Sequence, residues 1–197
     1  MSKDPSANVT PWVSRFAPLV QPGATVLDLA CGRGRHTEFF LARGNKVIAL
    51  DRDTSGMGAY ADNSACDVIT FDLEAEGLES KDPESLDFAV SNQAAVTYSE
   101  QLPFFQADLQ CIVIINYLYR PLFRALVQAI QPGGIILYQT FMVGNEAYGR
   151  PKNPAFLLSP QELPNTFNSD FDQIDFFEGY VTEPKEAMIQ CYCGRKR

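Results

Sequence analysis

Residues 26–36 read VLDLACGRGRH, and this stretch is the most informative about the fold. A short apolar run, typical of a buried strand, contains Asp28 and passes into a loop with Gly32 and Gly34. Helical residues follow at 36–42. Glycines let the backbone turn tightly here, and the first N–H groups of a helix are free to bind a ligand. The stretch therefore predicts a strand, a ligand-binding loop and a helix.

The same alternation of apolar runs and helical stretches continues on both sides. We expect strands at 24–30, 46–51, 67–72, 111–115 and 135–141, with helices at 12–20, 36–42 and 122–130. Nearly continuous apolar strands separated by helices are typical of a parallel sheet covered on both faces. Two later runs, 173–181 and 187–194, flank a Thr-Glu-Pro-Lys turn and predict an antiparallel hairpin. The predicted fold class is α/β, with a doubly wound, mostly parallel sheet and an antiparallel C-terminal hairpin strand.

Two stretches give weaker predictions. Residues 52–65 should hold the second crossover helix, but two glycines and two aspartates disfavour it. Residues 74–110 are long for one crossover and contain Glu-Gly, Asp-Pro and Leu-Pro breaks, so we expect an inserted helix or lid there. No internal repeat or linker divides the chain, which predicts a single domain over residues 1–197.

Composition narrows the classes of partner. The formal net charge is −8, and such an acidic body repels phosphate backbones, so we expect no nucleic-acid substrate. The chain has five cysteines at irregular spacing, which favours reduced thiols and a cytoplasmic location. We expect no membrane partner, because no apolar run approaches the length of a span.

Carboxylates end three successive predicted strands. Asp28, Asp51 and Asp72 should therefore meet at the carboxyl edge of the sheet. There Asp51 can accept the two hydroxyl protons of a ribose, and Asp72 can accept from an adenine amino group. Each position also has a plain structural interpretation: Asp28 and Asp72 as solvated acids, and Asp51 as a helix N-cap.

A dinucleotide site is disfavoured at the glycine loop. The third glycine of such a fingerprint is replaced by Thr37. The negative charge of Asp28 would repel a pyrophosphate, whereas it suits a cationic ligand. An NAD-type oxidoreductase is therefore the less favoured interpretation.

Two later segments, IINYLYRPLF at 114–123 and IQPGGIILYQTF at 130–141, complete a recognisable order of motifs. With the glycine loop and the strand-end acids, the chain resembles class I S-adenosylmethionine-dependent methyltransferases. NYLYRPLF and YGRPKNPAFLLSPQEL at 148–163 are similar to small bacterial tellurite-resistance-type methyltransferases. The resemblance implies a Rossmann-like methyltransferase fold with seven strands, of which the hairpin supplies the sixth and seventh.

The resemblance also implies a cofactor site. Asp28 and the two loop glycines would surround the cationic methionine part of S-adenosylmethionine, and the strand-end acids would hold its ribose and adenine. The full predicted cofactor set is Asp28, Ala30, Cys31, Gly32, Gly34, His36, Asp51, Arg52, Asp72, Leu73 and Asn116.

The candidate catalytic residues lie where the resemblance begins the substrate wall. They are Asn116, Tyr117, Arg120 and Arg150. Two arginines in an acidic protein suit a carboxylate, phosphate or oxyanion. The alternative is a structural pair that binds loop carbonyls and acids. Where relatives often carry Glu, this chain has Gln139, so an acidic role there is in doubt.

His36 and the cysteines have structural alternatives too. His36 is the only histidine, and a structural or cofactor-edge role competes with that of a general base. Cys191 and Cys193 share one face of a strand without a second ligand pair, so no metal site is expected.

The predicted function is methyl transfer from S-adenosylmethionine to a small, possibly anionic, acceptor by a monomer or homodimer. The alternative is a cofactor-binding regulatory or interaction module without catalysis. Binding of cofactor without turnover would distinguish the two.

Overall fold

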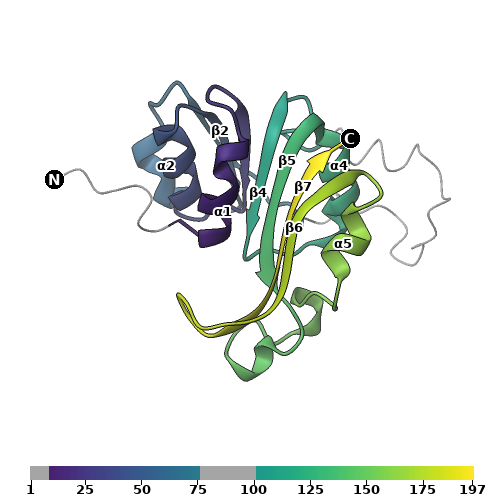
Figure 1. Ribbon diagram of the computed structural model, residues 1–197. Coiled ribbons are helices and arrows are strands. Elements are labelled where there is room, and N and C mark those ends of the chain that lie inside the picture. The colour runs from purple at the N-terminus through teal and green to yellow at the C-terminus, as the bar shows by residue number, and fades with distance from the viewer. Residues whose placement is uncertain (1–8, 76–100) are drawn as a thin grey trace.

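The computed structural model describes residues 9–75 and 101–197, which form a single seven-stranded sheet (Figure 1). The strand order is β3-β2-β1-β4-β5-β7-β6. The strands are β1 (Thr25–Leu29), β2 (Lys46–Asp51), β3 (Cys66–Thr70), β4 (Leu109–Ile115), β5 (Ile130–Phe141), β6 (Phe171–Val181) and β7 (Ala187–Lys196). Strands β1 to β5 pair in parallel, whereas β7 pairs antiparallel with both β5 and β6. The predicted fold class is therefore confirmed.

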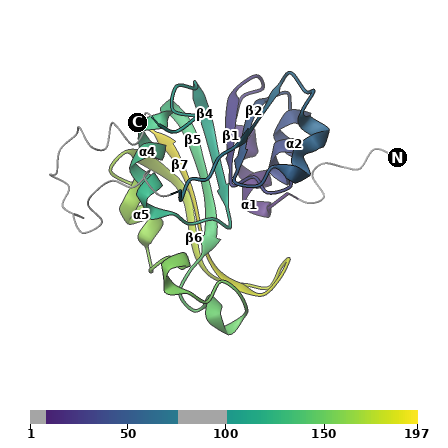
Figure 2. The same cartoon turned by 180° about the vertical axis from the view of Figure 1, so that it is seen from behind.

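Helices cover both faces of the sheet (Figures 1 and 2). One face carries α1 (Pro11–Phe16) and α2 (Arg35–Ala42), and the other carries α4 (Phe123–Ala129) and α5 (Glu162–Phe167). Short 3-10 helices complete the structure: η2 (Ala17–Leu19), η3 (Ser55–Tyr60), η4 (Arg120–Leu122), η5 (Asn145–Ala147) and η6 (Pro154–Phe156).

Strand periodicity divides the buried apolar side chains into two cores. In β1, Val26 belongs to the core under α1 and α2, while Leu27 belongs to the core under α4 and α5. Successive side chains of a strand point to opposite faces, so a strand buried on both faces is apolar almost throughout. This explains why the central strands are continuous apolar runs.

Three local predictions need correction. β3 ends at Thr70, before Asp72, and the crossover at 52–65 holds only η3 rather than a full helix. β5 starts at Ile130 instead of residue 135, because Gly133, at φ +80°, bends the chain within an irregularity of the β4–β5 pairing. The predicted insertion at 74–110 lies largely outside the described residues.

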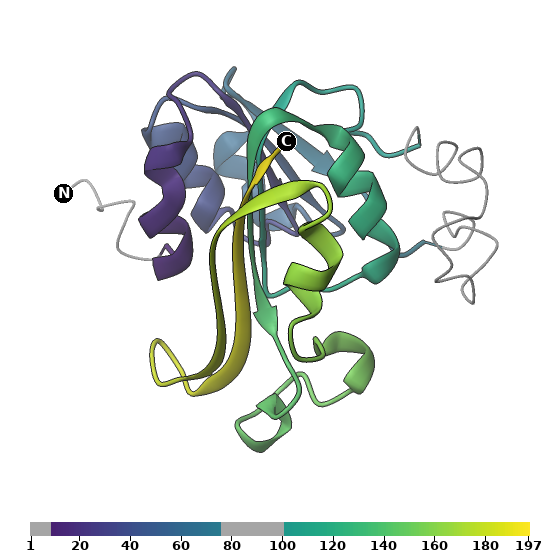
Figure 3. The same ribbon diagram turned by 45° about the vertical axis from the view of Figure 1, so that its right-hand side comes forward.

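The chain reverses its direction of sheet growth at β1. It runs outward through β2 and β3 and then returns to form β4 on the other side of β1. In such sheets, ligands bind in the crevice at the carboxyl ends of the two strands that flank this reversal. Figure 3 shows the β6–β7 hairpin running past the carboxyl end of β5. Among the described residues, no helix is long and apolar enough to cross a membrane.

Candidate functional site

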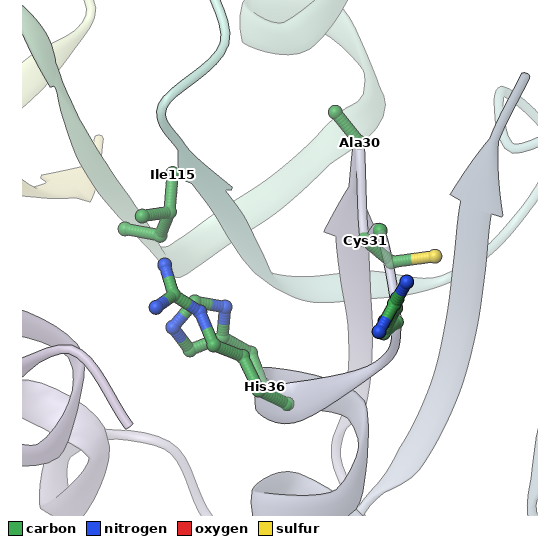
Figure 4. A pocket seen from close by; sticks show the side chains of 7 residues that line it. Ala30, Cys31, His36 and Ile115 are labelled. Atoms are coloured by element: carbon green, nitrogen blue, oxygen red, sulfur yellow. The ribbon is translucent and has the colours of Figure 1, made fainter. Parts of the chain in front are cut away.

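A cavity lies at the carboxyl ends of β1 and β4 (Figure 4). Its floor is the loop between β1 and α2, and the last residue of β4 closes one side. The lining residues are Ala30, Cys31, Gly32, Arg33, Arg35, His36 and Ile115. Four of them, Ala30, Cys31, Gly32 and His36, belong to the predicted cofactor set.

Asp28 is buried beneath the start of α2, with 2% of its surface exposed. The Thr37 hydroxyl donates to its carboxylate at 2.6 Å. Burial raises the pKa of Asp28 from 3.8 to about 6, although the Thr37 hydrogen bonds and the positive charge of Arg35 act in the opposite direction. A desolvated carboxylate of this kind is stabilised by a neighbouring cation. Asp28 is not among the cavity-lining residues.

Asp51 ties the glycine loop to the end of β2. One carboxylate oxygen accepts the Gly32 N–H at 2.9 Å, and the other accepts the Asp53 N–H at 3.0 Å. Each carboxylate oxygen can accept more than one hydrogen bond, so capacity remains for ribose hydroxyls. The two loops that the sequence assigned to the cofactor are thus joined by a direct bond.

Gly34 is required where it stands. Its φ is +80°, and a Cβ there would lie 2.7 Å from the Met57 sulfur and 3.0 Å from the Tyr60 ring. The loop can therefore pack closely against η3 only without a side chain at this position.

Asp72 lies two residues beyond the end of β3 and differs from the other two acids. Asp72 is exposed, and its carboxylate accepts the N–H of Glu74 at 3.0 Å in a local turn. Leu73 is 5% exposed and packs into the core, which anchors that turn, while Arg52 is exposed. Asp72 therefore keeps free lone pairs at the edge of the site.

Backbone strain marks both sides of the cavity. Ala30 has φ 56° directly after β1, and Asn116 has φ 59° directly after β4. Residues other than glycine rarely adopt this region, and such strain clusters at functional sites. The Asn116 N–H donates to the Gln139 carbonyl at 2.8 Å, which fixes this turn to β5. Both positions belong to the predicted site, but the sequence did not predict their left-handed backbone conformation. The one local signal was the residue type at 116, because Asn adopts this conformation more readily than most residues.

His36 is buried and held by the residue that precedes α1. Its Nε2 lies 2.9 Å from the Thr10 hydroxyl and 3.5 Å from the Thr10 N–H. Burial, together with the charge of Arg35, lowers the pKa of His36 to about 3. The imidazole is therefore neutral at physiological pH. Because Nε2 is committed to Thr10, this geometry favours the structural or cofactor-edge role over a general base.

Arg120 forms a structural cluster rather than an open anion site. Its guanidinium donates to both carboxylate oxygens of Glu162, at 2.6 and 3.0 Å. It also donates to the carbonyls of Ala155 and Leu157, at 2.8 Å each. Of the two interpretations of the arginines, the geometry at Arg120 favours the structural one. Glu162 is a partner that the sequence did not reveal.

Two further catalytic candidates are Arg150 and Tyr117. Arg150 is exposed in the loop after β5. The Tyr117 carbonyl accepts the Tyr138 hydroxyl at 3.0 Å, so its backbone is tied to β5. The convergence of the two arginines stays a prediction.

The cysteines are free thiols. All five are unpaired by disulfides, and Cys191 and Cys193 are buried in the core under α1 and α2. Burial raises the pKa of the Cys31 thiol, as expected for a small packing residue. Across residues 9–75 and 101–197, no group of three or more potential metal ligands comes together.

Comparison with known proteins places the chain among methyltransferases. The family model described as FtsJ-like methyltransferase matches residues 12–150. A probable protein arginine N-methyltransferase 3 of Oryza sativa subsp. indica is 24% identical over 140 residues, which cover 68% of this chain and 23% of that protein. The chain thus spans about a quarter of the length of that relative.

Solved structures share the fold at low sequence identity. TehB from Haemophilus influenzae superposes with a TM-score of 0.67 at 16% identity, covering 97% of this chain and 63% of TehB. The 1,6-didemethyltoxoflavin-N1-methyltransferase of Burkholderia thailandensis, solved with S-adenosylhomocysteine, gives 0.63 at 18% identity, covering 97% of this chain and 79% of that one. Both likenesses extend over nearly the whole chain.

Proposed function

Because the chain belongs to the FtsJ-like methyltransferase family, we propose that it transfers the methyl group of S-adenosylmethionine to a small-molecule acceptor. The observation that carries the proposal is the joined glycine loop and β2 end, where Asp51 accepts the Gly32 N–H beside a cavity at the strand-order reversal. The family resemblance inferred from the sequence is confirmed by the family match.

The residues present fit S-adenosylmethionine as the cofactor. Asp28 is a carboxylate whose pKa is raised by burial and which a cationic ligand would stabilise, and Asp51 keeps lone pairs for ribose hydroxyls. Asp72 offers an acceptor for the adenine amine. The toxoflavin methyltransferase with this fold was solved with the demethylated product of the same cofactor. When bound, the cofactor supplies a methyl group on a cationic sulfur.

The protein's own residues position the acceptor and exclude water. Methyl transfer is an in-line displacement, so alignment and desolvation carry most of the catalysis. Ile115 walls the cavity with an apolar side chain, and the strained backbone of Asn116 follows it directly. His36 holds its Nε2 toward Thr10, which removes that nitrogen as a base.

We propose that the acceptor is small and anionic. An acceptor that arrives deprotonated needs no general base, which fits the committed Nε2 of His36. Arg120 is bound to Glu162, whereas Arg33 and Arg35 line the cavity and Arg150 is exposed, so we expect these three to attract an anion. The net charge of −8 disfavours nucleic acid as the substrate.

An acceptor screen tests this proposal. The purified chain is incubated with methyl-labelled S-adenosylmethionine and a panel of small carboxylates, phenols, oxyanions and amines, and methylated product is measured. We expect turnover of an anionic member and its loss in Asp51→Ala. A chain that binds the cofactor but methylates no member of any such panel would instead be the non-catalytic module.

A further inference from the structure

Resting on the proposed function, we infer that His36 and Gln139 form the acceptor subsite and bind oxygen atoms that accept hydrogen bonds, as in a carboxylate. The two residues flank Ile115 on one face of the sheet. Each has its hydrogen-bond acceptor atom occupied by another residue of the protein, which leaves an N–H donor toward the ligand.

Ile115 brings the two side chains to the same place. It lines the cavity together with His36, whose ring is turned toward Ile115 in Figure 4. Ile115 also pairs in register with Gln139 on β5. Residues in register on neighbouring strands project to the same face, about 4.8 Å apart. That face carries α2, on whose first turn His36 lies.

His36 presents a donor because Thr10 determines its tautomer. The Thr10 backbone N–H can only donate, and it points at Nε2, so Nε2 is the nitrogen without a proton. The Thr10 hydroxyl shares this nitrogen at 2.9 Å. A neutral imidazole then carries its proton on Nδ1. No hydrogen bond of Nδ1 occurs among the described residues, and Nδ1 is not one of the buried unpartnered atoms.

Gln139 presents a donor because Cys191 occupies its carbonyl. The Cys191 thiol donates to Oε1 at 3.5 Å, within the range for sulfur. This hydrogen bond orients the Gln139 amide so that its oxygen faces Cys191 and its NH2 group faces away from Cys191. Gln139 is half-buried, and its Nε2 has no hydrogen bond in the described part of the chain, yet is not among the buried unpartnered atoms. The NH2 group is therefore accessible beside Ile115.

Two neutral donors select a definite ligand chemistry. N–H groups bind carboxylate or other oxyanion oxygens and leave an amine without an acceptor. A buried amine facing only donors would lose its hydrogen bonds, which costs binding free energy. The subsite therefore discriminates in favour of oxygen-bearing acceptors without requiring Arg120.

The single histidine makes the tautomer directly measurable. Long-range proton–nitrogen NMR of the ¹⁵N-labelled protein, bound to S-adenosylhomocysteine, shows one imidazole. We expect the Nδ1–H tautomer. Addition of acetate, benzoate or inorganic phosphate should shift Nδ1 and the Gln139 side-chain amide, which is assigned by its absence in Gln139→Glu. Benzylamine should shift neither.

Variants separate this inference from the proposed function. In Gln139→Glu the donor becomes an anionic acceptor, so we expect the affinity for the responding anion to fall at least about tenfold. Affinity for S-adenosylhomocysteine should stay within about twofold. Gln131→Glu, an exposed position at the start of β5, makes the same charge change and should alter neither. Gln139→Leu, of similar size, provides a second loss of the donor.

Three outcomes would overturn the inference. An Nε2–H tautomer would turn an acceptor, not a donor, toward the ligand. No response to any of the three anions, with S-adenosylhomocysteine bound, would refute the subsite and leave the proposed function standing. Failure to bind S-adenosylhomocysteine at all would refute both.

Discussion

Asp28 is a carboxylate that is buried beneath the start of α2. Its pKa lies near 6 because desolvation outweighs the hydrogen bonds from Thr37. The same residue type at Asp51 is only half-buried and already accepts two backbone N–H groups. The two aspartates therefore have different surroundings. Burial dominates at Asp28, whereas backbone N–H donors contact Asp51.

The pH dependence of stability tests the state of Asp28. The folded pKa is about 6 against 3.8 in the unfolded chain, so the unfolded state releases this proton first as pH rises. This residue's contribution to the free energy of unfolding should fall by about 2.5 kcal/mol between pH 4 and pH 7. In Asp28→Asn this pH-dependent contribution to the free energy of unfolding should disappear. Urea unfolding of both proteins at each pH measures the difference, and identical pH profiles would contradict the assignment.

Gly34 gives a second prediction at the scale of one residue. In Gly34→Ala, the new Cβ meets the Met57 sulfur at 2.7 Å with φ at +80°, so we expect destabilisation by about 1–2 kcal/mol. Gly58→Ala is the matched control, because nothing lies within 4 Å of its added Cβ and its φ is not in the left-handed range. Equal thermal unfolding midpoints of the two variants would refute the close packing.

The hydrogen bonds that Arg120 donates to Glu162, Ala155 and Leu157 hold the segment after β5 against the segment that follows β4. Arg120 begins η4, and Glu162 begins α5. The ion pair also orders the chain between them, because Glu162 accepts the Ser159 N–H at 2.8 Å. With 18% of its side chain exposed, Glu162 would lose its partner in a poorly hydrated place if Arg120 were removed.

Replacement of Arg120 tests whether this cluster is structural. We expect Arg120→Met to lower the free energy of unfolding by about 2 kcal/mol, since several charge-assisted hydrogen bonds are lost. Arg150→Met, at an exposed position, should change it little. Affinity for S-adenosylmethionine should be unchanged in both. An Arg120→Met protein of full stability but with a raised KM for the acceptor would return Arg120 to the catalytic set.

Local signals explain which elements the sequence predicts. β1, the glycine loop and α2 follow from one contiguous stretch, and Asp51 follows from the end of the next strand. By contrast, Arg120 and Glu162 are 42 residues apart, and Thr10 and His36 are 26 apart. Nothing local couples such pairs, so the sequence left both roles of Arg120 open. The crossover at 52–65 shortened to η3 because its glycines and aspartates disfavour a helix.

For the whole molecule, topology and charge favour the same class of ligand. The reversal at β1 opens a crevice on one edge, and the glycine loop, Asp51 and Asn116 all reach that edge. The chain's net charge of −8 opposes polyanions, which is consistent with the small acceptor that we propose. We propose that this edge binds S-adenosylmethionine.

Calorimetric titration of the purified chain with S-adenosylmethionine tests that claim most directly, with NADH as the comparison ligand and Asp28→Ala alongside. We predict binding of S-adenosylmethionine but not of NADH. The substitution should weaken this binding at least about tenfold, or about 1.4 kcal/mol. A chain that ignores S-adenosylmethionine after any co-purified nucleoside has been removed, or that binds NADH equally well, would contradict the account.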